Sequence, residues 1–215
     1  GLSGAPIFAV SDSCNRLMGK ERQKFHVRIT NKKMSQFKVH VQHITYGWCG
    51  IEISINGKRI ICEAGYLGSN PIASLISACL ELSVTEIEGG ENEEYISKSR
   101  IVWEEEPGTM SLDLKLSRSN QVSIDIQERD DDENILEEWH EGVPFDDFKQ
   151  AIVSEGFRVL NTFGLYGYYV AWLDRQEFPL SQLLRLTDKL KLTWNGDNCS
   201  TDLAKEMECL SAFVE

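Results

Sequence analysis

The chain has 215 residues, of which 41% are hydrophobic and 26% are charged, with a formal net charge of −12. This composition is typical of a globular protein with its own core, and it excludes a mostly disordered chain. No apolar run reaches the roughly 18 residues that a membrane-spanning helix needs, so we expect no membrane association.

The charge is distributed unevenly along the chain. Residues 1–33 carry seven basic and two acidic side chains, a net charge of +5, which leaves −17 for residues 34–215. With this charge, residues 34–215 repel phosphate groups and attract basic protein surfaces. We therefore expect a basic protein partner and no nucleic acid, although the acidity also has a simpler use in keeping the protein soluble.

The same contrast predicts two parts, a basic N-terminal extension over residues 1–33 and a single α+β domain over residues 34–215. Two interpretations of residues 1–33 stay open. In the first, Met34 is the native start and the preceding residues are an added extension. In the second, the alternating segment Phe25–Thr30 is a genuine edge strand of the domain.

The six cysteines form no C-x-x-C pair, and no cysteine and histidine cluster has the spacing of a zinc site. Scattered free thiols are typical of a reducing compartment, so we expect a cytoplasmic protein. No metal and no cofactor is predicted.

Alternating apolar and polar residues predict the first strands. Phe37, Val39 and Val41 share one face of a strand, and a second strand follows over Trp48–Ile55. Asn56-Gly57 then suits a two-residue type I′ turn, because both central positions of that turn need positive φ. The other arm of this hairpin is expected from about Lys58 to Ala64.

A helix is expected next. Asn70 is a good N-cap, Pro71 fits the first helical position, and apolar residues follow at helical spacing up to Ser83. Residues 86–94 are expected to form an acidic loop. Three strands then follow as a meander, over residues 100–106, 111–116 and 121–128.

The rest of the chain is interpreted as mostly helical. A helix starts at Pro144, and Gly156 interrupts its pattern. The segment Phe157–Leu173 is left open between a buried helix and a strand, Pro179–Leu190 is a clear helix, and Ser200 caps a last helix with Leu203, Met207 and Leu210 buried. Together these elements predict an α+β fold. Its antiparallel sheet would have about five to six strands, a hairpin plus a three-stranded meander, with helices packed on one face.

Acidic residues gather in two segments. Residues 86–106 contain eight acidic and two basic side chains, and residues 125–147 contain eleven acidic side chains and Arg129. The functional interpretation is a docking face for a basic partner, and the simpler one is a set of solvated loops and charged strand edges. The predicted partner-binding residues are Glu104, Glu105, Glu106, Asp130, Asp131, Asp132 and Glu133.

Motifs of catalysis and ion binding are weak. Asp130, Asp132, Asn134 and Glu141 have the spacing of calcium ligands in an EF-hand loop, but Ile135 stands where the sharp turn requires glycine. Cys49 beside a strand histidine could act as a nucleophile, although a small strand residue is the simpler interpretation. No G-x-S-x-G, P-loop or dinucleotide-binding motif is present, so no catalytic residue is predicted.

The order of several segments resembles a known class. GWCGIEISINGK, EAGYLGSNPIASLISACLEL, VWEEEPGTMSLDLKL, NQVSIDI and EFPLSQLLRL together resemble small acidic bacterial proteins of the immunity or uncharacterised type, over residues 37–190. The resemblance implies a single α+β domain that neutralises a toxin by binding it, and it carries no site residue over.

The leading hypothesis is thus a non-enzymatic acidic protein that binds a basic partner, such as a toxin domain. The alternative is a small-molecule-binding protein or enzyme, whose aromatic-lined pocket would lie near Trp48, Trp103 and the segment Phe163–Trp172. A third hypothesis is a subunit that mainly self-associates into a homo-oligomer.

Overall fold

The structure is a computed structural model that describes residues 37–65, 70–83, 95–190, 193–195 and 198–213. The expectations for residues 1–33, including the strand Phe25–Thr30, and for the loop 86–94 lie outside this range. Within it, no helix is both long enough and apolar enough to cross a membrane.

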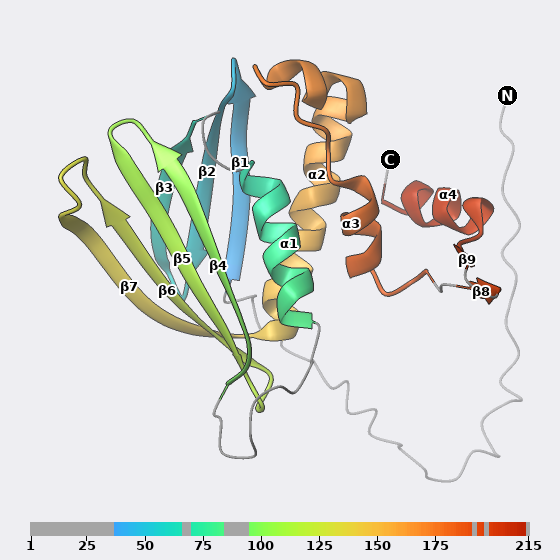
Figure 1. The fold of residues 1–215 in the computed structure, drawn as a ribbon, viewed down its shortest axis with the longest axis horizontal. Helices are drawn as coiled ribbons and strands as arrows, with labels where there is room; N and C mark the ends of the chain where they lie inside the picture. The colour runs from blue at the N-terminus through green and yellow to red at the C-terminus, as the bar shows by residue number, and fades with distance from the viewer. Residues whose placement is uncertain (1–36, 66–69, 84–94, 191–192, 196–197, 214–215) are drawn as a thin grey trace, which may run out of the picture. The chain divides into compact units, whose positions relative to one another are not determined.

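One antiparallel sheet dominates the fold (Figure 1). Its strands follow one another in chain order as β1 (Phe37–Thr45), β2 (Trp48–Ile55), β3 (Lys58–Ala64), β4 (Tyr95–Glu105), β5 (Gly108–Ser117), β6 (Gln121–Arg129) and β7 (Ile135–Pro144). The α+β class and the antiparallel sheet are confirmed, and the expected five to six strands become seven. The additional strand is β7, which sequence patterning missed because most of its residues are exposed and only Trp139 and Val143 are buried.

The hairpin of β2 and β3 is confirmed, with Asn56 and Gly57 both at positive φ, 52° and 89°. The next junction is different. Among the described residues, β3 pairs with β4 at Ala64 opposite Glu105, whereas the other neighbouring strands pair along most of their length. The backbone N–H of Gly65 donates to the Glu104 carbonyl at 2.8 Å beside this pair.

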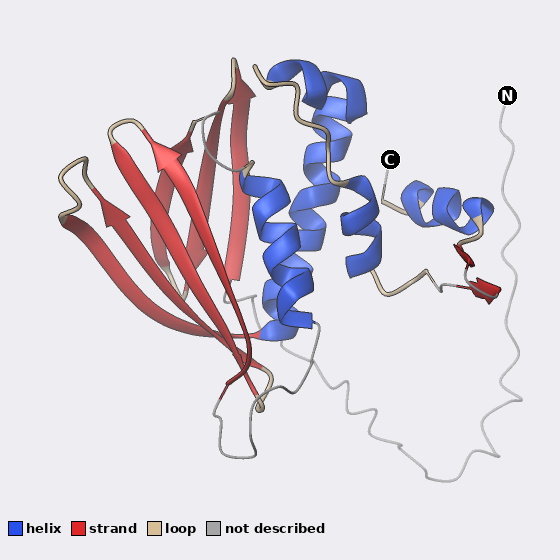
Figure 2. Cartoon of the chain, viewed as in Figure 1, coloured by secondary structure: helices blue, strands red, loops and turns tan. Residues whose placement is uncertain are grey.

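Two helices cover one face of the sheet, as Figure 2 shows, and the hydrophobic core lies between them and the strands. Helix α1 (Pro71–Ser83) packs on β4, where the indole N–H of Trp103 donates to Ser74 Oγ at 2.8 Å. Helix α2 (Phe145–Ala171) packs on β1, with the rings of Phe37 and Phe148 4.8 Å apart. The expected N-cap of α1 is confirmed, because Asn70 Oδ1 accepts the N–H of Ala73.

Helix α2 continues through Gly156, contrary to the expected interruption. A Cβ at this position would lie 2.7 Å from Leu183 Cδ1, so glycine is needed here for close packing against α3 (Leu180–Leu186). Of the segment Phe157–Leu173, left open between a helix and a strand, residues 157–171 are helical, with a kink at Gly164, where φ is 62° and ψ is 175°. Beyond the kink, Tyr168 is buried and its hydroxyl donates to Asn70 Oδ1 at 2.7 Å.

The C-terminal elements are β8 (Thr193–Asn195), β9 (Asn198–Ser200) and α4 (Leu203–Ser211). Two expectations for the last helix are wrong. Asp202 caps it, not Ser200, since the Asp202 side chain accepts the N–H of Ala204. Of the expected buried stripe, Leu203 and Met207 are exposed and Leu210 is half-buried. The buried residue of α4 is Cys209, whose Sγ lies 3.7 Å from the Thr187 hydroxyl at the end of α3.

Candidate functional site

The sheet brings two acidic turns together at one end. The first is the connection from β4 to β5, where Glu104 and Glu105 end β4 and Glu106 begins the turn. The second joins β6 to β7 and holds residues 130–133. The turns are adjacent because β5 pairs with β6 up to Thr109 opposite Arg129. A Cβ on Gly108 would lie 2.1 Å from the Arg129 carbonyl oxygen and 3.3 Å from Asp130 Cα. We call these seven acidic residues, 104–106 and 130–133, the acidic end.

Two of the seven have structural roles. The Glu105 carboxylate accepts the N–H of Glu63 at 2.8 Å and so joins β4 to β3. Asp130 Oδ1 accepts the backbone N–H groups of Asp132 and Asn134 and organises its own turn. The Asn134 side-chain amide also donates to the Asp130 carboxylate, and this bond, followed by the backbone bonds from Asn134 and Asp132, lowers the pKa of Asp130.

The other five acidic residues, Glu104, Glu106, Asp131, Asp132 and Glu133, are exposed. Among the described residues, the side chains of Glu104, Glu106 and Asp131 have no hydrogen bond or ion pair. Their side chains face solvent.

Little positive charge offsets the acidic end. Arg129 is held within its own turn, with Nη1 donating to the Glu133 carbonyl and Nη2 to Gln127 Oε1, each at 3.0 Å. Behind the turns, burial and the neighbouring carboxylates of Glu105 and Glu137 raise the pKa of Glu128. The end of the sheet is therefore a region of concentrated negative potential.

The acidic end does not form the calcium loop that the spacing suggested. Glu141 lies within β7, where it is paired with Lys58 Nζ at 2.7 Å and Asn56 Nδ2 at 2.8 Å. Asp130 is occupied by backbone donors of its own turn. In the part of the chain that the structure describes, no group of three or more acidic, cysteine or histidine side chains is arranged to hold a metal ion.

The structure does not give Cys49 the surroundings of a catalytic nucleophile, and it buries two of the aromatic residues expected to line a pocket. Cys49 is buried, and burial together with Glu63 and Glu155 raises the pKa of its thiol to about 12, the reverse of what a nucleophile needs. His43 faces Glu63 instead, with Nε2 and Oε2 3.2 Å apart. Of the aromatic residues expected around a pocket, Trp103 and Trp172 are fully buried in the core.

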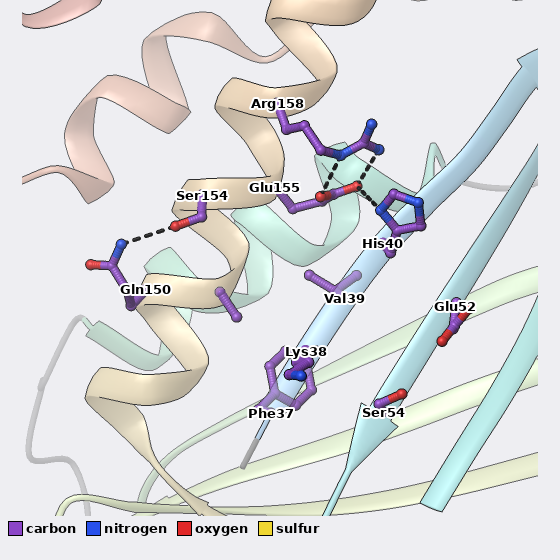
Figure 3. Close-up of a pocket in the computed structure, with 11 residues that line it drawn as sticks. Phe37, Lys38, Val39, His40, Glu52, Ser54, Gln150, Ser154, Glu155 and Arg158 are labelled. Carbon is purple, nitrogen blue, oxygen red and sulfur yellow. Dashed lines mark hydrogen bonds and ion pairs between the residues drawn. The ribbon is translucent and has the colours of Figure 1, made fainter. Parts of the chain in front are cut away.

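A groove of about 510 Å³ lies along the outer edge of β1 (Figure 3). One wall is the strand segment 37–40 with Glu52 and Ser54 of β2, and the other is a face of α2 that includes Gln150, Ala151 and Ser154. Glu155 and Arg158 of α2 close one end of it, as the close-up shows.

Glu155 and Arg158 hold the backbone of β1. The Glu155 side chain is 6% exposed, and its Oε1 accepts the N–H of Val41 at 2.5 Å and Arg158 Nη2 at 2.6 Å. The same Nη2 donates to the Val41 carbonyl at 2.5 Å, and the Glu155 carboxylate raises the pKa of the guanidinium. His40 Nδ1 lies 3.6 Å from Glu155 Oε1.

Sequence reasoning missed this pair, although a signal was present. Phe148, Ile152 and Val159 form the buried stripe of α2, and Glu155 falls on the same stripe at helical spacing. A charged residue in an apolar stripe with an arginine three positions later indicates a buried, paired carboxylate.

Comparisons of the chain with protein-family models, curated proteins and solved structures give no match.

Proposed function

We propose that the protein is a non-enzymatic binding protein whose acidic end docks a basic protein partner. The adjacency of the two acidic turns at Gly108 and Arg129 carries this proposal, because it merges two acidic segments into one surface. Charge of one sign at one place steers an oppositely charged partner and raises the association rate. A basic toxin domain, neutralised in the cytoplasm, is the partner that the resemblance to immunity proteins implies.

The exposure of the carboxylates supports the proposal. Glu104, Glu106 and Asp131 have no partner among the described residues, so binding would not have to break an existing ion pair. Burial first, and then the carboxylates of Glu105 and Glu137, raise the pKa of Glu128, and incoming positive charge would relieve the repulsive part. The alternative of an aromatic-lined pocket has no comparable support, since Trp103 and Trp172 belong to the core.

The test compares two charge-matched triple variants of the full chain. The first, Glu104→Gln, Glu106→Gln and Asp131→Asn, neutralises the acidic end. The control, Glu177→Gln, Glu208→Gln and Asp174→Asn, removes the same charge from exposed positions elsewhere. Each protein is used as bait in lysate of the source organism, and bound proteins are identified by mass spectrometry.

We expect one basic protein on the wild type and the control variant at about 50 mM salt, and little of it on the acidic-end variant or at about 0.5 M salt, where screening is strong. With the purified partner, stopped-flow kinetics should show the loss mainly in the association rate. Equal binding by both variants, or capture that is independent of salt, would contradict the proposal.

A further inference from the structure

The outer edge of β1 is a strand edge with room beside it. β1 is first in the strand order of the sheet, so among the described residues it has a strand partner on one side, β2. The N–H and carbonyl of Val41 point to the other side, where Glu155 and Arg158 bind them. Because residues two apart in a strand direct their backbone groups to the same edge, those of Val39 also point outward.

The N–H and carbonyl of Val39 open onto the groove, whereas those of Val41 are bound by the side chains of Glu155 and Arg158. Val39 lines the groove, its residue is 7% exposed, and within the described residues its outward N–H and carbonyl have no hydrogen-bond partner. Outward N–H and carbonyl groups on the edge of a sheet are a template for pairing with another strand. A ligand that offers one acceptor and one donor in strand geometry would satisfy both.

Glu155 and Arg158 already act as such a partner one step along the strand. The carboxylate accepts where a neighbouring strand would place a carbonyl, and the guanidinium donates where that strand would place an N–H. The pair thereby ends the groove at Val41 and sets the register of anything bound beyond it. The register of β1 on β2 is unbroken from Phe37 to Val41 and shifts between Val41 and His43, so the irregularity lies beyond the groove.

The walls of the groove suit a peptide backbone. Ala151 and Ser154 are small and leave space beside the strand edge, and the volume of about 510 Å³ lies in the usual range of ligand sites. On the outer face, Lys38 lies opposite Ser54, and the Lys38 ammonium has no ion-pair partner among the described residues. It would face a side chain of an added strand.

We propose that this groove binds a short extended peptide segment as an added strand on β1. The central residue of the segment pairs with Val39, and a neighbouring acidic side chain lies over Lys38. Main-chain hydrogen bonds supply the affinity, and the Lys38 position supplies selectivity. This inference is independent of the proposed function, because it concerns other residues and a ligand of opposite charge.

The test selects random seven-residue peptides by display on the full-length wild-type protein. Selected peptides are then measured by fluorescence anisotropy against two variants. Ser154→Trp places a large ring in the groove at an exposed helix position, and Thr162→Trp places the same ring at another exposed position of α2, outside the groove. Circular dichroism verifies that both variants keep the fold.

We expect enriched peptides with an acidic residue, whose affinity falls at least about tenfold in Ser154→Trp and stays within about twofold in Thr162→Trp. N-methylation of the peptide amide that pairs with Val39 should weaken binding equally, and Lys38→Glu should reverse the charge preference. Hydrogen exchange of the Val39 amide should slow in the complex.

Two results would overturn the proposal. One is a selection in which no peptide distinguishes wild type from Ser154→Trp. The other is a groove-dependent peptide that is insensitive to N-methylation at every position, since it would bind through side chains and not as a strand. Preference for basic peptides that Lys38→Glu leaves unchanged would remove the assigned role of Lys38.

Discussion

Arg158 and Val41 are 117 residues apart in the chain, yet Arg158 Nη2 donates to the Val41 carbonyl at 2.5 Å. The same guanidinium holds the Glu155 carboxylate, which accepts the N–H of Val41. One ion pair on a helix thus satisfies both backbone groups at the edge of a sheet. Exposed strand edges invite pairing with other chains, and here a charged pair occupies the edge at this position.

Breaking this pair should destabilise the fold. We expect Glu155→Ala to lower the free energy of unfolding by about 3–5 kcal/mol, because it leaves Arg158 unpaired and removes the acceptor of the Val41 N–H. As a control, Arg100→Ala removes an exposed ion pair with Asp113, and its effect should be below about 1 kcal/mol. Urea unfolding followed by tryptophan fluorescence measures both, and equal effects would refute a special role for Glu155.

Gly108 should be intolerant of any side chain. Its φ is 117°, and a Cβ would meet the Arg129 carbonyl oxygen at 2.1 Å, so Gly108→Ala must move the two acidic turns apart. We expect a loss of about 2–4 kcal/mol in unfolding free energy. Gly57→Ala is the matched control, with φ of 89° but open space around it, and should cost about 1 kcal/mol. Thermal unfolding measures the loss of stability in both variants, and a larger loss in Gly108→Ala indicates a clash in addition to backbone strain. Similar losses of stability in the two variants would contradict the clash.

Glu128 should make stability depend on pH near the acidic end. Burial and the carboxylates of Glu105 and Glu137 raise its pKa in the folded state, so the folded protein retains this proton at higher pH than the unfolded chain. Stability from this group is present at low pH and is lost as the pH rises through the folded pKa. Glu128→Gln should therefore raise Tm at pH 7 and have little effect near pH 4. A greater gain at pH 4 would reverse the assigned sign.

His140 and Asp125 should titrate as partners. Nδ1 and Oδ1 are 2.9 Å apart, and this bond, followed by the charge of Asp125, raises the pKa of His140. The pair stabilises the fold below the ordinary histidine pKa of about 6.5, and the contribution is lost as the pH rises through the folded pKa. In NMR titrations, Asp125→Asn should lower the pKa of His140. An unchanged pKa would show that the hydrogen bond does not form in solution.

Local patterns predicted much of the fold. The Asn56-Gly57 turn, the cap at Asn70 and the alternation of β5 and β6 each have a short-range cause, and each is confirmed. The strand β7 was missed because its inward residues are too few to make an alternating pattern. The predicted interruption at Gly156 was wrong for a different reason. A glycine is present there because Leu183 packs closely against the helix, and the helix continues through it.

The candidate sites depend on longer-range relations. The acidic residues are evident from composition, but their adjacency requires the register of β5 on β6, in which Thr109 lies opposite Arg129. The roles of Glu105 and Asp130 in holding backbone N–H groups follow from turn geometry that composition does not contain. The groove requires α2 to lie beside β1, and no local signal places a helix there.

The junction at Ala64 and Glu105 has a mechanical consequence. Neighbouring strands within β1–β3 and within β4–β7 pair along most of their length, whereas β3 and β4 meet at that pair and the hydrogen bonds beside it. A pulling force applied across the sheet would be carried at this junction by few backbone hydrogen bonds, so the strain per bond would be greatest there. Because Glu104 and Glu106 flank this junction, a force applied through the acidic end would act directly on it.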